Sequence, residues 1–230
     1  MANFAIAASA DDIHDMPSGG NVCSVSTVVM SLGRYRDAGS FYDYKAYMGL
    51  RFLNINIPAG STIDSAKITF TAAARKNDAI EDGNISPVIG AEAVADAAAI
   101  DCVNREPSDL YPAVLTAHTV TWDITDGLWT ENNTKDTPSL TAIIQEVIEI
   151  AGWASGNDIL ILIDGVSAYE ARSVYSYDGD PAKAPVLVVT WTAPPSGPAG
   201  VKTINDLAIA SVKTINDLAT GSIKTINDSA

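Results

Sequence analysis

The sequence has few of the residues on which catalysis and disulfide scaffolds depend. Its 230 residues include two histidines and two cysteines, and a small secreted domain held together by disulfides needs more cysteines than that. We therefore expect Cys23 and Cys102 to be free, buried thiols. No apolar run is long enough to cross a membrane. The first residues lack the basic start of a signal peptide, so we expect export by another route, release by lysis, or no export.

Basic residues are also scarce. The chain has 14 Lys and Arg against 28 Asp and Glu, a formal charge of -14, and its cations never cluster, which excludes nucleic acid and anionic membranes as expected partners. The sequence contains no Gly-x-Ser-x-Gly, phosphate-binding loop or metal-type histidine pair. His118 stands in a strand pattern beside Val120 and Trp122, where a structural role is expected. We predict a protein without enzymatic activity.

The residues that are abundant favour strands. Hydrophobic residues make up 47% of the chain, and Ala, Val and Ile dominate them, with many Thr and Ser, a mixture suited to half-buried sheets. Residues 66–72 alternate strictly, with Ile68 and Phe70 on one face, and residues 158–164 form a short apolar run typical of a buried strand. Turn residues separate such segments at intervals typical of a sandwich. We predict a β-sandwich over residues 1–193.

One segment has helical spacing. The apolar residues between Leu140 and Ala151 recur on one face of a 3.6-residue period. Thr137 suits the N-cap, Pro138 the first helical position, and Gly152 the C-terminal stop. We predict one helix here, covering one end of the sandwich.

The last part of the chain is a repeat. A Pro- and Gly-rich linker spans residues 194–200, and residues 201–230 read VKTINDLAIAS, VKTINDLATGS and IKTINDSA, a period of 11 residues. Such short units must bury their apolar side chains against neighbours, another chain or a partner. We predict short strands with Asn-Asp turns, as in an intertwined trimer or solenoid, over a supercoiled helix or a disordered tether. The predicted assembly residues are Val201, Ile204, Leu207, Val212, Ile215, Leu218, Ile223 and Ile226.

Two sets of side chains are candidates for ligand binding. Aromatic rings near polar groups suit either a sugar site or a subunit interface; the candidates are Tyr35, Tyr42, Tyr44, Tyr47 and Trp129. Carboxylates on loops suit a structural calcium ion, the one cofactor considered; the candidates are Asp11, Asp12, Asp178 and Asp180. The alternative for the acidic set is two solvated loops.

A set of ordered segments resembles a known family. The segments are GLRF at 49–52, NIPAGSTIDSA at 56–66, VTW at 120–122, QEV at 145–147, GWASGN at 152–157 and SYDGD at 176–180, followed by Ala184 and Pro185. They resemble the carbohydrate-binding-module-like jelly-roll domains of the DNRLRE type, found in bacterial extracellular and phage proteins. The resemblance covers residues 10–192 and implies a jelly-roll sandwich without catalytic machinery. The tail resembles the Lys-Thr-Ile-Asn-Gly-Leu repeats at the ends of some phage tail and virion proteins, with Asp in place of that Gly.

Two functions follow as hypotheses. The first is a structural component of a phage-type virion, a capsid decoration or tail-associated subunit, whose jelly roll faces outward. Its C-terminal repeats would bind copies of the chain, in a homotrimer, or other virion proteins. The second is a secreted carbohydrate-binding or adhesion module that recognises a surface glycan. Both place the protein outside the cytoplasm, in a virion or the extracellular space.

Overall fold

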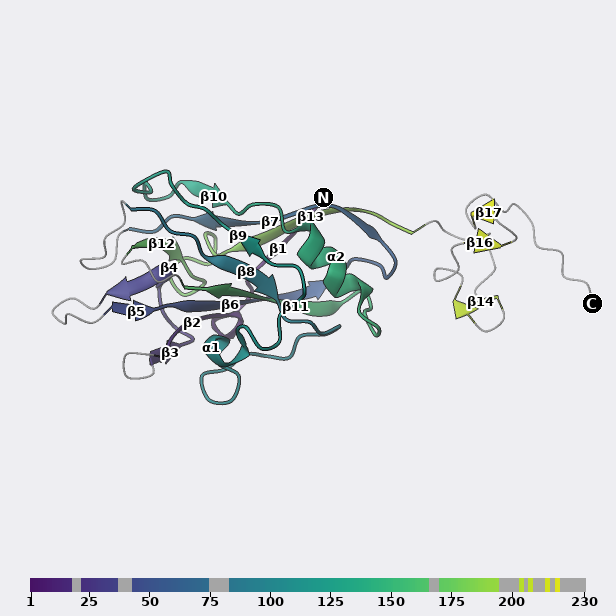
Figure 1. The fold of residues 1–230 in the computed structure, drawn as a ribbon, viewed down its shortest axis with the longest axis horizontal. Helices are drawn as coiled ribbons and strands as arrows, with labels where there is room; N and C mark the ends of the chain where they lie inside the picture. The colour runs from purple at the N-terminus through teal and green to yellow at the C-terminus, as the bar shows by residue number, and fades with distance from the viewer. Residues whose placement is uncertain are drawn as a thin grey trace, which may run out of the picture.

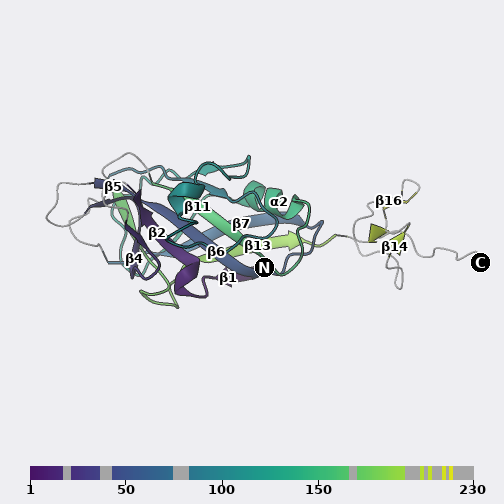
Figure 2. The ribbon, with the colours of Figure 1, turned by 90° about the horizontal axis from the view of Figure 1, so that it is seen from below.

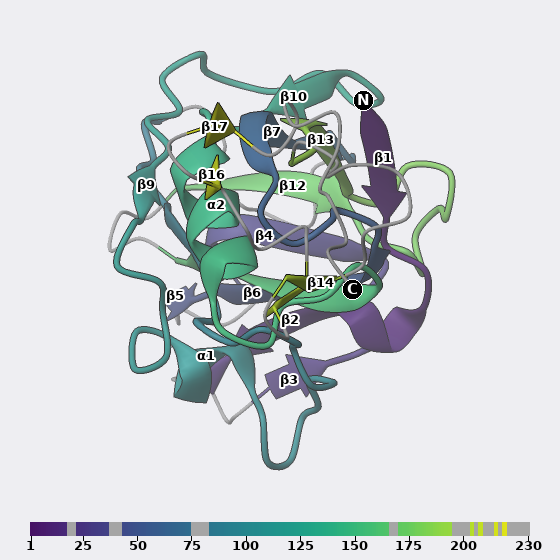
Figure 3. The ribbon, with the colours of Figure 1, turned by 90° about the vertical axis from the view of Figure 1, so that its right-hand side faces the viewer.

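The computed structural model describes residues 1–17, 22–36, 43–74, 83–165 and 170–194, together with four two-residue strands in the tail. The protein is an all-β sandwich with a jelly-roll-like fold, as the sequence predicts. The four-stranded sheet lies above the six-stranded sheet in Figure 1, and the view along the long axis in Figure 3 shows the same two layers.

The first layer is an antiparallel sheet of four strands. Its order is β1 (Ala2–Ala5), β13 (Val186–Thr192), β7 (Thr62–Thr71) and β10 (Thr134–Asp136). The predicted alternation in β7 is confirmed, because Ile68 and Phe70 are fully buried while Lys67 and Thr69, which precede them in turn, are partly exposed.

The second layer is an antiparallel sheet of six strands. Its order is β3 (Val22–Ser24), β2 (Asp12–Met16), β6 (Tyr47–Ile55), β11 (Asn157–Asp164), β8 (Val88–Ala91) and β9 (Val120–Thr121). A third sheet of three strands contains β12 (Ala171–Tyr175), β4 (Val29–Arg36) and β5 (Asp43–Lys45). Figure 2 shows β2, β6 and β11 overlying β7 and β13.

The six-stranded sheet is covered on both faces. Ile159, Ile161 and Ile163 of β11 belong to the main core, whereas Leu160 and Leu162 belong to a second core. A loop-rich segment, residues 93–116, provides the outer part of that second core. It includes helix α1 (Pro107–Leu110). Burial on both sides explains why this strand reads as a continuous apolar run.

The predicted helix is present but begins later than expected. Helix α2 spans Thr141–Glu149 and buries Ile143, Ile144, Val147 and Ile148. The prediction of Thr137 as N-cap was wrong. Thr137 pairs instead with β7, since its amide donates to the Ile68 carbonyl and its hydroxyl accepts from the Ile68 amide. This pairing with β7 holds Thr137 outside the helix, which starts four residues later.

The first two tail repeats form matching hairpins. Strand β14 (Thr203–Ile204) pairs with β15 (Leu207–Ala208), and β16 (Thr214–Ile215) pairs with β17 (Leu218–Ala219), in the same register 11 residues later. The predicted short strands in these repeats are confirmed, and Asn-Asp separates the strands of each hairpin. The third repeat, with Ile223 and Ile226, lies outside the described residues, as do Val201 and Val212.

Candidate functional site

A small pocket opens beside strand β10. Its volume is about 160 Å³, and its walls come from the segment after β9 and from β10. The lining residues are Trp122, Asp123, Ile124, Thr125, Asp126, Trp129, Lys135 and Asp136. Trp129, one of the predicted ligand-binding residues, therefore lies at the pocket with a second tryptophan.

The two indoles form the apolar wall of the pocket and pack against neighbouring side chains. Their ring centroids are 5.8 Å apart, and Phe70 stacks on Trp122 from the core. The Trp129 indole N–H donates to Asp126 Oδ1 at 2.8 Å. Lys135 Nζ lies 5.3 Å from the Trp129 ring centroid and Arg172 Cζ 5.9 Å from it, so two cations contact one ring. Trp129 is only 6% exposed, which means that it is mainly a core residue with one edge at the pocket.

Two carboxylates of the pocket, Asp126 and Asp136, are charged and already engaged. Burial raises the pKa of Asp126, but hydrogen bonds from Lys135 and Trp129 outweigh it and hold the pKa below its ordinary value. Burial acts in the same way on Asp136, whose pKa is lowered by Lys67 at 2.5 Å and by a hydroxyl of β7. The pocket thus combines an ammonium donor, carboxylate acceptors and indole edges. That set can bind a small molecule that both donates and accepts hydrogen bonds.

Three of the predicted tyrosines, Tyr35, Tyr44 and Tyr47, belong to another part of the molecule. Tyr35 and Tyr44 are directly opposite on the β4–β5 hairpin. Tyr47 of β6 contacts the Tyr111 ring, 6.0 Å between centroids, and Lys45 Nζ lies 4.8 Å from the Tyr47 ring. None of the tyrosines lines the pocket beside β10 as far as side chains are described, and Tyr42 lies outside the described residues.

An ion pair lies beside this tyrosine cluster. Lys45 Nζ is 2.5 Å from Asp164 Oδ1, and Asp164 also bonds the Tyr111 hydroxyl. Burial raises the pKa of Asp164 and of the Tyr111 phenol. Since Lys45, Tyr47, Tyr111 and Asp164 contact one another, the cluster fixes the start of β6 against the end of β11.

The structure joins the two predicted acidic segments but not as a metal site. The Asp12 carboxylate accepts from the Tyr177 amide at 2.6 Å, and Ser9 Oγ donates to Asp178 Oδ1 at 2.9 Å. Asp11 lies 3.5 Å from Arg51 instead. Within the described ranges, no three His, Cys, Asp or Glu side chains come together as a metal-binding group. The four predicted calcium ligands are therefore not gathered around one point.

Asp180 is engaged by its own turn. Its carboxylate accepts from the Ala182 amide and pairs with Lys183 Nζ at 3.1 Å. Hydrogen bonds from Lys183 and Ala182 lower the pKa of Asp180. The residue thus stabilises the turn before β13.

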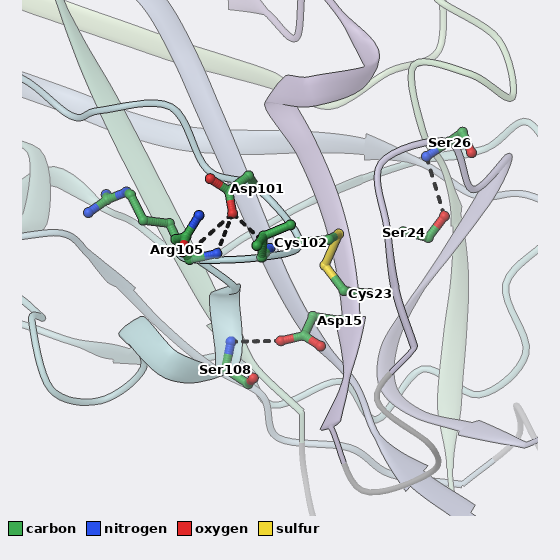
Figure 4. The surroundings of a disulfide bond; sticks show 10 residues. Asp15, Cys23, Ser24, Ser26, Asp101, Cys102, Arg105 and Ser108 are labelled. Carbon is green, nitrogen blue, oxygen red and sulfur yellow. Dashed lines mark hydrogen bonds between the residues drawn. A yellow bond between two sulfur atoms is a disulfide. The ribbon is translucent and has the colours of Figure 1, made fainter.

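The prediction of free cysteines was wrong. Cys23, at the edge strand β3, and Cys102, in the segment covering the second core, form a disulfide across 79 residues, as Figure 4 shows. The pairing depends on how the covering segment folds over the sheet, and two isolated cysteines in a sequence carry no signal of it. Sequence reasoning also missed Arg172, a fully buried cation that donates to the Ala171 and Gly83 carbonyls.

Comparison with known proteins assigns the chain to no family. No protein-family model matches the chain, and no curated protein matches its sequence. In the part of the chain that the structure describes, no helix is long and apolar enough to span a membrane. The fold and the local geometry therefore carry the functional reasoning.

Proposed function

We propose that the protein is a non-enzymatic building block of a phage-type particle, in which the sandwich faces outward and the C-terminal repeats dock the subunit. The observation that supports this most directly is the pair of identical hairpins, β14–β15 and β16–β17. An isolated two-stranded hairpin is marginally stable in water, and these strands have only two residues each. Further strands from other chains would supply the missing pairing.

Charge favours the tail as the contact between subunits. The tail carries three Lys and three Asp, so the net charge of -14 belongs to residues outside the repeats. Copies of the sandwich repel one another, whereas neutral repeats do not. Homotrimers fit intertwined repeats of this kind, and other virion proteins with similar strand edges are the alternative docking partners.

The disulfide supports a role outside the cytoplasm. Disulfides persist in oxidising surroundings such as particle surfaces and are rare in the cytosol. A bond between Cys23 and Cys102 is therefore suited to a subunit on the exterior of a released particle.

Removal of the tail tests the docking role. Deletion of residues 195–230 should leave a folded sandwich, with far-UV circular dichroism typical of a β protein, but reduce the mass measured by light scattering to that of a monomer. A full-length variant with Ile204, Ile215 and Ile226 changed to Asn should behave in the same way. Its control changes Lys202, Lys213 and Lys224 to Arg, which keeps the charge and should keep the oligomer. A full-length protein that is monomeric would refute docking between copies of the chain.

A glycan-binding or adhesion module is the second candidate, favoured by the pocket beside β10. Indole edges, carboxylate acceptors and the Lys135 ammonium form the kind of mixed surface that binds sugar hydroxyls. A glycan array with the wild-type protein and with Lys135→Met tests this function. Binding that is weakened by Lys135→Met, but not by Lys183→Met, a lysine that does not line the pocket, would support it. An array without hits would remove it.

A further inference from the structure

The surroundings of the disulfide suggest when it forms. We propose that Cys23 and Cys102 form a redox latch, that is, a disulfide whose two thiols are already adjacent in the reduced protein. The thiols stay reduced while the subunit is in the cytoplasm, and the disulfide forms after the particle is released from the cell. The timing rests on the proposed role in a particle, which is assembled inside a cell and works outside it. The alignment rests on the contacts around the two residues alone.

The loop that carries Cys102 is shaped by one carboxylate. Asp101 Oδ1 accepts hydrogen bonds from the amides of Val103, Asn104 and Arg105, at 2.8, 2.6 and 3.2 Å. The Asp101 amide in turn donates to the Arg105 carbonyl at 3.3 Å. These bonds lie around Cys102 (Figure 4). We therefore expect the turn to keep its shape whether or not the sulfur is bonded.

Two further contacts hold this loop to the body, and both come from residues that follow Cys102 in the chain. Arg105 Nη2 donates to both oxygens of Glu92, at 2.9 and 2.8 Å, and Glu92 is 5% exposed. After the loop, the Ser108 amide donates to Asp15 Oδ2 at 2.9 Å. Such charge-assisted bonds are among the stronger hydrogen bonds in proteins.

Asp15, which binds the Ser108 amide, also lies beside the other cysteine. Asp15 of β2 lies directly opposite Cys23 of β3 in the antiparallel register. One anchor of the Cys102 loop is therefore attached to the neighbour of Cys23. Both cysteines also pack against the second core, which includes Ile13 and Ile100. This arrangement keeps the two thiols adjacent in the reduced protein.

The thiols are accessible to small reagents, since both cysteines are partly exposed. Closure proceeds by thiol–disulfide exchange with a small oxidised disulfide. One cysteine thiolate attacks it, releases one small thiol and forms a mixed disulfide. The second cysteine thiolate then displaces the other small thiol and forms the protein disulfide. Overall, the protein loses two hydrogens and the small disulfide is reduced to two thiols.

Closure should stabilise the protein without reshaping it. A cross-link between positions 79 residues apart restricts the unfolded chain strongly. For a chain of this length we expect the oxidised form to melt about 10 °C above the reduced form. The two forms should have the same circular dichroism and tryptophan fluorescence at 25 °C.

Trapping thiols inside cells tests the timing. Full-length protein expressed in a bacterial cytoplasm is treated with N-ethylmaleimide before lysis, and its intact mass is measured. We expect two alkylated cysteines, and none when purified protein is first treated with oxidised glutathione. A disulfide already formed in the cytoplasm would overturn the latch, yet would leave the tail-dependent assembly of the proposed function unaffected.

Kinetics of closure test the alignment. Asp101→Ala should slow disulfide formation in oxidised glutathione by about tenfold or more, because it loosens the turn around Cys102. Asp109→Ala, on the exposed side of α1, should not slow it. The double variant Cys23→Ser with Cys102→Ser should melt at the temperature of the reduced protein, with or without reductant. Loss of the fold on reduction, or unchanged closure in Asp101→Ala, would refute the alignment.

Discussion

Replacement of Asp12 by Asn should make the protein more stable at alkaline pH. Asp12 lies on β2, whose five residues are all buried, and its side chain is 1% exposed. One carboxylate oxygen accepts from the Tyr177 amide, and the other, Oδ1, has no hydrogen-bond partner in the structure. Burial raises the pKa of Asp12 to about 7, with Asp178 and Asp11 contributing in the same direction. Asparagine keeps the carbonyl acceptor for Tyr177 and removes the charge.

The sign of the effect follows from the direction of the pKa shift. The folded protein holds this proton more tightly than the unfolded chain, whose Asp pKa is near 3.8. The contribution of the neutral Asp12 carboxyl to the free energy of unfolding is therefore fully present below about pH 4. It is lost as the pH rises through about 7. At about 1.36 kcal/mol per pH unit, ionising the buried group costs about 4 kcal/mol at pH 8. Asp12→Asn does not ionise at this position, so its free energy of unfolding does not fall from this cause over this pH range.

Urea unfolding followed by tryptophan fluorescence provides the measurement, because Trp122, Trp129 and Trp153 are buried. The free energy of unfolding of Asp12→Asn minus that of the wild type should grow from pH 5 to pH 8, reaching a few kcal/mol. Asp64→Asn, an exposed carboxylate on β7, is the matched control and should show no such growth. A constant difference between Asp12→Asn and the wild type across this range would refute the reasoning.

Three further substitutions test the packing and the polar network. Gly49→Ala would place its Cβ 2.9 Å from Ile100, so we expect a loss of about 1–3 kcal/mol by urea unfolding as the covering segment shifts. Arg51→Met leaves Asp158 without its ion pair at 2.5 Å and should cost about 3 kcal/mol, most of which a second change, Asp158→Asn, should restore. Glu146→Gln weakens bonds from α2 to the loop before β9, at about 1 kcal/mol. Burial raises the pKa of Glu146, but these hydrogen bonds outweigh burial and lower it. The stability that the Glu146 carboxylate contributes is therefore lost as the pH falls. On acid titration, the free energy of unfolding should fall less in Glu146→Gln than in the wild type.

Local patterns in the sequence predict much of the secondary structure. The alternation in β7 and the apolar run of β11 arise from one-sided and two-sided burial of strands, and both appear as predicted. The apolar face of α2 is as predicted from Ile143 to Ile148, whereas Ala151 is exposed beyond the helix end. The start of the helix also differs, because Thr137 pairs with β7 and a local cap rule cannot anticipate a partner 69 residues away.

The candidate site was only partly visible in the sequence. Trp129 was a predicted ligand residue and does line the pocket, but its ring is nearly buried and bonded to Asp126. Of the tyrosines predicted with it, Tyr35 and Tyr44 lie on β4 and β5, and Tyr47 lies on β6. Aromatic residues can be counted in a sequence, whereas the direction of each ring depends on strand register and on neighbours from other sheets.

The sequence by itself determined the all-β class, the presence of one amphipathic helix and the repeating strands of the tail, because each depends on spacing between near neighbours. Only the tertiary structure decided that Cys23 bonds Cys102, that Asp12 meets Tyr177 across 165 residues, and that β10 and the segment after β9 enclose a pocket. These contacts depend on how sheets pair and how the covering segment folds back. Segments far apart in the chain meet only when the whole sandwich closes around a shared core.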